Sequence, residues 1–179
     1  MLKEKISQNL NSALKEKREL EVSVLRQLLA AVFNKEKEKR YKLSKEKPNL
    51  DLEKLGKESP QIKELEKQSA FNDEEIIEVI SSEIKKEKEA LTLFEKGKRD
   101  DLVKKVKAEI EILGKYLPEQ LSEDELKKLI REAIAKVGAK EMRDMGKVMA
   151  ELMPKIKGQA DTGQISQNVK DLLSTAQGK

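Results

Sequence analysis

The chain has 179 residues, of which 38 are Lys or Arg and 34 are Asp or Glu, giving a formal net charge of +4. It contains neither Cys nor His, so disulfides, thiolate nucleophiles, Cys/His zinc sites and proton transfer by imidazole are excluded. Charged residues make up 40% and aromatic residues only 3%, and the many Lys, Glu, Leu and Ala residues favour an all-α fold.

The N-terminal residues, Met1 to Lys5, lack the apolar core of a signal peptide, and no stretch has the ~20 apolar residues that cross a bilayer. We therefore expect a cytoplasmic protein with no membrane partner. Helices are predicted at 2–17 and 19–39, because apolar residues recur there every three or four positions. The second pattern fades into a charged run at 35–40, so we expect this end to fray or to run into solvent.

The segment 41–72 has no sustained period, and two prolines and a glycine interrupt it. It predicts a mobile loop or insertion, with a short helix near 61–68. Two further helices are predicted at 73–96 and 99–116, the first ended by a glycine and the second by Pro118. These elements predict an N-terminal antiparallel helical bundle over 1–117, with the domain boundary at Pro118.

The tail, residues 118–179, has the most regular pattern and predicts a small three-helix domain, with helices at 122–137, 142–153 and 161–174. Ser122 and Glu125 form a capping box at the first of these helices. Pro154 is expected to break the second helix, because a proline inside a helix costs ~3 kcal/mol. Asp161 is expected to cap the third.

The stretch 136–158 is the least generic part of the tail. It holds six Lys and Arg residues against three Asp and Glu residues, a surplus of three positive charges in 23 positions. Gly146 lies inside a helix, where glycine costs ~1 kcal/mol relative to alanine. This favours tight packing of another helix against Gly146 over a contact with RNA. Gly158 follows a short basic run and is expected in a left-handed conformation.

The segment 144–161 resembles the motif of the GatB/YqeY family, and segments 116–126, 73–77 and 100–102 agree with it. The resemblance to YqeY-like proteins covers nearly the whole chain. The resemblance to GatB, a subunit of the tRNA-dependent Glu/Asp amidotransferase, covers only about 119–174. It implies an all-helical fold in two parts, with a tail that in GatB lies against the outer corner of tRNA. The chain departs from the family where Thr162 follows Asp161 and in the length of 41–72.

Carried onto this chain, the resemblance makes four residues candidate phosphate contacts, namely Lys147, Lys155, Lys157 and Gly158. Charge and proximity add Lys140 and Arg143. The alternative is a solvated surface in a lysine-rich protein, and the two interpretations are near parity. With so few aromatic residues to stack on bases, binding is expected to depend on shape and charge.

The sequence offers no catalytic constellation. No Ser lies in a glycine-rich elbow or beside a suitably spaced Lys, and no phosphate-binding loop accompanies metal-binding carboxylates. We therefore expect no catalytic residue, cofactor or metal, although domain inheritance can label such a chain a carbon–nitrogen ligase with glutamine as amido donor. The predicted function is a non-catalytic module for tRNA or other structured RNA, related to the amidotransferase. The alternative is a helical protein–protein adaptor without a nucleic-acid role. Expected protein partners are an amidotransferase or a translation-related protein.

Overall fold

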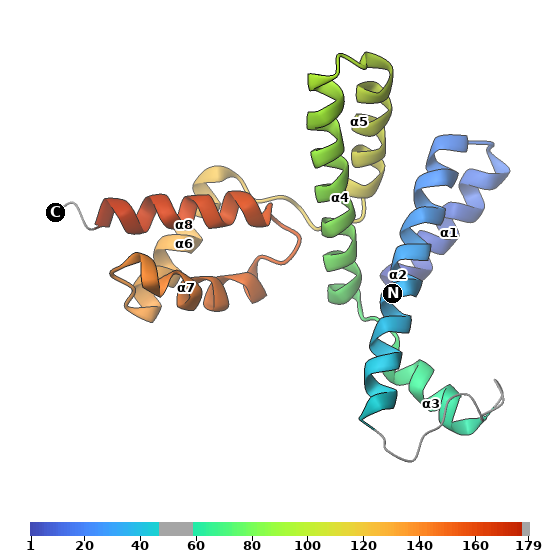
Figure 1. Ribbon diagram of the computed structural model, residues 1–179, viewed down its shortest axis with the longest axis horizontal. Coiled ribbons are helices and arrows are strands. Elements are labelled where there is room, and N and C mark those ends of the chain that lie inside the picture. Colours follow the sequence, from blue (N-terminus) through green and yellow to red (C-terminus); the bar gives the residue numbers. More distant parts are fainter. Residues whose placement is uncertain (47–58, 177–179) are drawn as a thin grey trace. The chain divides into compact units, whose positions relative to one another are not determined.

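The computed structural model describes residues 1–46 and 59–176. Within these ranges the protein is all-helical, with eight α-helices, two single-turn 3-10 helices and no strand (Figure 1). The fold class expected from the sequence is confirmed. The chain divides into two compact units, Met1–Tyr116 and Leu117–Lys179. None of the helices in the described ranges combines the length and the apolar character needed to span a bilayer.

The first unit is built from two helical hairpins and a short additional helix (Figure 1). The hairpins pair α1 with α2 and α4 with α5, and α3 packs against α2. The bounds are α1 Leu2–Lys15, α2 Glu19–Lys45, α3 Pro60–Ser69, α4 Asp73–Lys96 and α5 Asp100–Gly114. Between the hairpins, α2 contacts both α4 and α5, and α1 contacts α4, so the two hairpins share one core.

The two hairpins turn in the same way. Lys17 and Lys98 occupy the left-handed region, with φ of 56° and 53°. The residue after each lysine closes the turn, since its backbone N–H reaches a carbonyl five positions back, at 2.9 Å for Arg18 and 3.0 Å for Arg99. This bond satisfies one of the carbonyls that the end of a helix leaves without a partner. The short connections expected near 17–19 and 96–98 are therefore closed turns.

The core of the first unit consists of apolar side chains that recur along each helix at the expected three- and four-residue spacing. Burying each large aliphatic side chain contributes roughly 1.5–3 kcal/mol. The fully or nearly buried residues are Ile6, Ala13, Val24, Leu25, Leu28, Val32, Leu65, Ile76, Val79, Ile80, Ile84, Val106, Ile112, Leu113 and Tyr116.

The second half of α2 does not fray, contrary to the expectation from its charged sequence. Glu36 is 5% exposed, and its carboxylate pairs with Nζ of Lys3 at 2.6 Å. The same carboxylate accepts a hydrogen bond from the backbone N–H of Phe71 at 3.0 Å. Lys39 pairs with Glu75 at 2.6 Å, and the guanidinium of Arg40 pairs with Glu66 at 2.9 Å. Charged side chains, rather than an apolar stripe, therefore fasten this half of the helix.

The segment 41–72, predicted as a mobile loop or insertion, is ordered helix at both of its described ends. Residues 41–45 continue α2, and Pro60–Ser69 forms α3, which agrees with the short helix predicted near 61–68. Leu65 and Ser69 are fully buried, which fixes α3 against α2. The loop prediction is wrong for these ends because one buried leucine suffices to dock a short helix. Its central part, 47–58, lies outside the described residues.

The second unit contains three α-helices and two 3-10 turns that frame the middle helix (Figure 1). They are α6 Glu123–Val137, η1 Met142–Asp144, α7 Met145–Leu152, η2 Met153–Lys155 and α8 Thr162–Ala176. The predicted capping box is present, because Ser122 Oγ accepts from Glu125 N at 3.3 Å and Glu125 Oε2 accepts from Ser122 N at 3.0 Å. Asp161 Oδ1 accepts from the backbone N–H of Gly163 at 2.9 Å, as expected for the cap of the last helix.

A single apolar core holds the second unit together. Every helix contributes to it, and the residue after the 3-10 turn η2 is part of it as well. The buried members are Leu126, Ile130, Ala133, Ala139, Val148, Leu152, Ile156, Ile165, Val169 and Leu173. This core positions the basic stretch 136–158 on the surface above it.

Candidate nucleic-acid interface

The six residues predicted to contact phosphate lie before, within and after α7, and we call them together the tail corner. Val148 and Leu152 bury one side of α7, which directs Lys147 on its other side to solvent. Pro154 ends the α-helix as predicted, and the chain continues through η2. Ile156, only 1% exposed, anchors the turn that carries Lys155 and Lys157.

Gly158 has a φ of 72°, the left-handed conformation expected from the sequence. Its carbonyl accepts a 2.6 Å hydrogen bond from Nε2 of Gln120. The backbone N–H of Leu121 donates to the carbonyl of Gln159 at 2.8 Å. The segment that leads into α6 is thereby clasped to the tail corner, so the geometry of the turn is set by two hydrogen bonds that the sequence did not suggest.

Cations at the start of α7 are paired with neighbouring carboxylates. Nζ of Lys147 lies 2.9 Å from Asp144, and Nε of Arg143 lies 2.9 Å from Glu141. The Lys147 ammonium is the main cause that holds the pKa of Asp144 at about 2, and the backbone N–H groups of Lys140 and Glu141 add to it. Asp144 in turn raises the pKa of Lys147. Both groups therefore stay charged across the physiological range.

At the end of α7, the carboxylate of Glu151 pairs with two lysines. Glu151 lies 2.7 Å from Nζ of Lys155 and 2.7 Å from Nζ of Lys136, which comes from the last turn of α6. Hydrogen bonds from Lys136 and then Lys155 lower the pKa of Glu151 to about 2. Lys136 was counted in the charge of this stretch but not placed in the site. The structure adds Lys136 to the site. Its place in the last turn of the helix predicted at 122–137 was the feature of the sequence that could have indicated this.

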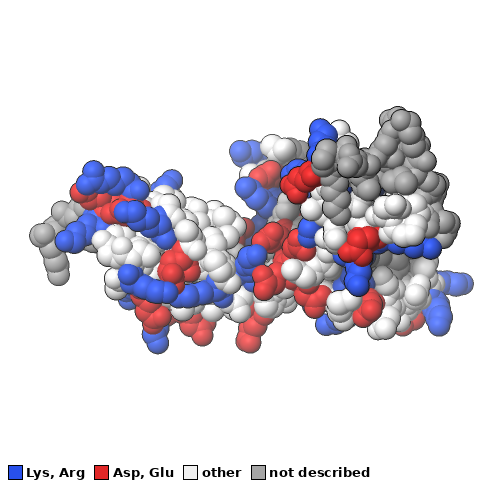
Figure 2. All heavy atoms as spheres, turned by 90° about the horizontal axis from the view of Figure 1, so that it is seen from below, with Lys and Arg blue, Asp and Glu red and all other residues white. Residues whose placement is uncertain are grey.

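The structure brings the predicted residues together as two groups rather than one cluster. Lys140, Arg143 and Lys147 lie at the start of α7, and Lys155, Lys157 and Gly158 follow its end. Lys147 and Lys155 are eight residues apart, which is ~12 Å along a helix. On the face seen in Figure 2, blue Lys and Arg side chains lie among red Asp and Glu side chains.

Gly146 is not packed against another helix of the described chain, contrary to the expectation from the sequence. Apart from the neighbouring backbone of α7, a side-chain carbon placed at Gly146 would meet no atom within 4 Å. Neither a packed helix nor any other segment of the described chain approaches this position. The expectation of tight helix packing at Gly146 is therefore wrong, and the structure gives no reason for a glycine there.

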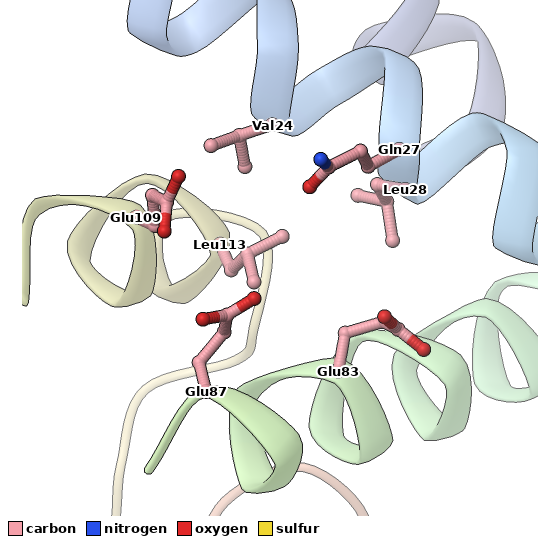
Figure 3. A pocket seen from close by; sticks show the side chains of 7 residues that line it. All are labelled: Val24, Gln27, Leu28, Glu83, Glu87, Glu109 and Leu113. Carbon is pink, nitrogen blue, oxygen red and sulfur yellow. The ribbon is translucent and has the colours of Figure 1, made fainter. Parts of the chain in front are cut away.

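A second polar cluster, not predicted from the sequence, lies between the helices of the first unit. Glu83 and Glu87 of α4 and Glu109 of α5 line a cavity of about 10 Å³, room for roughly one water molecule. Figure 3 shows their carboxylates among the apolar side chains Val24, Leu28 and Leu113 and the amide of Gln27. Burial, followed by the charges of Glu109 and Glu83, raises the pKa of Glu87.

The carboxylates of the cavity are partly neutralised from outside. Nζ of Lys86 lies 2.6 Å from Glu83, and Nζ of Lys105 lies 3.9 Å from Glu109. In the described ranges, no group of three or more carboxylates has the arrangement of a metal site. The cavity is thus a small site, lined in part by polar side chains, within the helical core.

The sequence also matches a known family. A family model described as Yqey-like protein matches residues 44–173, well over half of the chain. The chain belongs to the YqeY-like family. The match runs through α3, α4, α5 and the whole core of the second unit. The resemblance to YqeY-like proteins is confirmed, whereas the relation of the tail to GatB stays a prediction.

The chain is also similar to a fungal protein. This relative is altered inheritance of mitochondria protein 41, mitochondrial, from Pyrenophora tritici-repentis (strain Pt-1C-BFP), with 30% identity over 105 residues. The similarity covers 56% of this chain and 57% of the relative, so the chain spans little more than half the length of the curated protein it matches. The name of that relative places it in mitochondria, and the cytoplasmic location expected for this chain stays a prediction.

Proposed function

We propose that this protein is a non-catalytic helical module that contacts tRNA, or another structured RNA, through the tail corner. The observation that carries the proposal is the row of cations that runs from α7 into the 3-10 turn η2. Lys147 on α7 and Lys155 on η2 both have exposed side chains, and a buried core holds this segment in place. Lys136 joins them from α6 through Glu151. Such a row suits the regularly spaced phosphates of a folded RNA.

The ion pairs of the tail corner do not argue against phosphate binding. Exposed pairs of this kind contribute little to stability, because water competes for both partners. A phosphate that approaches Lys147 or Lys155 exchanges one anionic partner for another. We infer that Asp144 and Glu151 keep the cations extended and in place until an RNA phosphate takes over.

The resemblance of segment 119–174 to the tail of GatB supports a role related to the tRNA-dependent amidotransferase. In this proposal the chain supplies RNA contacts and no chemistry, since the parts of GatB that hold its active centre have no counterpart here. A complex of the amidotransferase, tRNA and this chain would be its setting. Sedimentation of the mixture, with and without tRNA, tests whether the three associate.

A mobility-shift titration with bulk tRNA tests the RNA contact. Four to six phosphate contacts predict a slope of about −3.6 to −5.4 for the logarithm of the association constant against the logarithm of salt concentration. The triple variant Lys147→Glu, Lys155→Glu, Lys157→Glu should lose the shift. An unchanged shift in this variant would remove the tail corner from the interface.

The matched control is a second triple reversal in the same unit. Lys128, Arg131 and Lys170 are exposed on α6 and α8 and have no carboxylate within ion-pair distance among the described residues. Their replacement by Glu changes the net charge equally. Equal loss of binding in the control would mean that overall charge, and not the tail corner, attracts the RNA.

A protein–protein adaptor is the second candidate, and a groove at the turn between α1 and α2 favours it. Leu14, 43% exposed, lines this groove with Val22, Arg26 and other residues of the two helices. Affinity purification in high salt with nuclease should recover a partner if the groove is used. Leu14→Glu should release that partner, and Leu93→Glu, at an apolar residue exposed on α4, is the control. Recovery of the same partner with Leu14→Glu would remove the groove from this role.

A further inference from the structure

Helix α2 carries a row of alternating aromatic and basic side chains on its solvent side. Phe33, Lys37, Tyr41 and Lys45 follow one another at every fourth position, so they form a row that winds slowly along the helix. We call these four residues the α2 row. Phe33 is 53% exposed and Tyr41 57% exposed. Two of the five aromatic residues of the chain thus face solvent on one helix.

The lysines of the α2 row lie over the rings. Nζ of Lys37 lies 5.7 Å from the centre of the Phe33 ring, and Nζ of Lys45 lies 4.5 Å from that of Tyr41. These cation–π contacts are weak at exposed sites, so each lysine can leave its ring at little cost.

The charge of the α2 row is available to a ligand. Among the described residues, Lys37, Lys45 and the neighbouring Lys42 have no carboxylate within ion-pair distance. This differs from Lys39 and Arg40 of the same helix, which are paired across to α4 and α3. Between Lys37 and Lys45, the basic side chains of α2 therefore divide into a paired set that fastens the helix and a set around the rings that has no ion-pair partner among the described residues.

We propose that the α2 row binds the unpaired nucleotides of a single-stranded RNA or DNA segment. Bases stack on Phe33 and Tyr41, and the lysines turn from the rings to the adjoining phosphates. Single-strand binding without sequence preference needs this pair of features, cations along the backbone and aromatic faces for successive bases. The rings are eight residues apart, ~12 Å along the helix. That distance is about three to four stacked nucleotides at ~3.4 Å each.

The composition of the row favours a nucleic acid over a membrane. A helix that lies in a membrane surface needs a wide, continuous apolar face. The α2 row offers two rings separated by lysines, while the apolar face of α2 is already used in the core by Val24, Leu28 and Val32. This site lies in the first unit and goes beyond the function proposed for the tail corner.

The experiment compares three probes of equal length, namely oligo(U), oligo(dT) and an abasic phosphodiester strand. Fluorescence anisotropy measures binding of each to the full chain. The double variant Phe33→Leu, Tyr41→Leu removes the aromatic faces and keeps apolar, helix-forming side chains. Lys37→Gln with Lys45→Gln removes two cations. The control, Lys85→Gln with Lys104→Gln, removes the same charge from exposed positions on α4 and α5.

We expect oligo(U) and oligo(dT) to bind at least about tenfold more tightly than the abasic strand, with Phe33→Leu, Tyr41→Leu abolishing the difference. The lysine pair should weaken all three probes, and the control pair should weaken them less. Equal affinity for abasic and base-bearing strands, or no effect of removing the rings, would overturn the proposal. Binding to anionic lipid vesicles but to none of the strands would overturn it as well.

Intrinsic fluorescence supplies a readout that a purely structural role of Tyr41 would not change. The chain has two tyrosines and no tryptophan. Tyr116 is buried, with its hydroxyl 2.8 Å from Nδ2 of Asn9, so Tyr116→Phe leaves Tyr41 as the reporter. Stacking of a base should quench Tyr41 with oligo(U) and not with the abasic strand. Quenching that survives Glu substitution of Lys147, Lys155 and Lys157 separates this site from the tail corner.

Discussion

The α2 stretch 33–46 and the tail stretch 136–158 each hold six Lys and Arg residues against three Asp and Glu residues. In the tail, Asp144 and Glu151 lie between the cations and pair with them. On α2, Glu36 is buried against Lys3 instead, and the lysines around the exposed rings have no acidic partner within ion-pair distance among the described residues. Equal formal charge therefore produces two surfaces with different amounts of available charge. The packing of the acids, more than their number, decides which surface attracts an anion most directly.

The largest expected effect tests whether the tail corner depends on its buried anchor. Ile156→Ala should lower the free energy of unfolding of the second unit by about 2–5 kcal/mol, because it opens a cavity beside α7. Calorimetry measures the change. Leu93→Ala, at an apolar residue that is 66% exposed, should change stability by no more than about 0.5 kcal/mol. Equal effects of the two substitutions would contradict an anchoring role.

A smaller loss is expected on the α2 side of the comparison. Glu36→Ala leaves the Phe71 N–H and Lys3 without their acceptor and should destabilise the first unit by about 1–3 kcal/mol. Chemical denaturation checks this. Glu38→Ala breaks an exposed pair with Lys35, which water screens, and is the control. A Glu36 variant as stable as the Glu38 variant would mean that α2 is fastened by other contacts.

Removing an acid beside the tail corner should leave its cations without an ion-pair partner among the described residues, like the lysines of the α2 row. Glu151→Gln releases Lys136 and Lys155, and each freed charge can then attract a phosphate without competition from this carboxylate. We expect affinity for tRNA to rise several-fold at low salt in mobility-shift titrations. Glu132→Gln, at an exposed acid of α6, should raise it less. No difference between the two would show that pairing with Glu151 does not limit the cations.

The smallest effect concerns pH, where the tail corner and the carboxylate cavity should respond in opposite directions. Burial raises the pKa of Glu87 in the folded protein, so its contribution favours folding at low pH and is lost as pH rises through that pKa. Glu87→Gln should therefore slightly stabilise the first unit at pH 7 and not at pH 3. Thermal melts at the two pH values measure this, and equal shifts at both would contradict it.

The pKa of Glu151 is shifted in the opposite direction to that of Glu87. Its pKa is lowered to about 2, so its contribution to stability is present above the pKa of the unfolded chain and disappears as pH falls towards 2. Asp144 behaves in the same way. Carboxyl titrations followed by NMR should show these two groups as the last to protonate in the second unit.

Periodicity in the sequence was enough to place most helices, since buried residues such as Ile80, Ile130 and Val169 recur with the spacing of a helix face. It was not enough for the second half of α2 or for α3. There the order comes from Glu36, Arg40 and the single buried Leu65, and a charged run with one leucine looks unstructured when read alone. Contacts between residues distant in sequence decide such segments.

The candidate site shows the same limit. The family resemblance, with charge and proximity, selected the residues of the tail corner, whose role stays a prediction, and glycine chemistry gave the left-handed Gly158 correctly. The pairing of Lys136 with Glu151 could not be read from the sequence, because it joins two helices. The scarcity of aromatic residues argued against base stacking, yet a total of five does not reveal that Phe33 and Tyr41 share one exposed row.

The clasp between Gln120, Leu121 and the turn at Gly158 makes the tail corner observable without any label. The Leu121 amide lies outside the helices and is held by the Gln159 carbonyl alone, so its hydrogen exchanges with solvent only when that turn opens. Its exchange rate is therefore a local gauge of corner rigidity. Slower exchange when RNA is added would report occupation of the corner from a position that bears no charge.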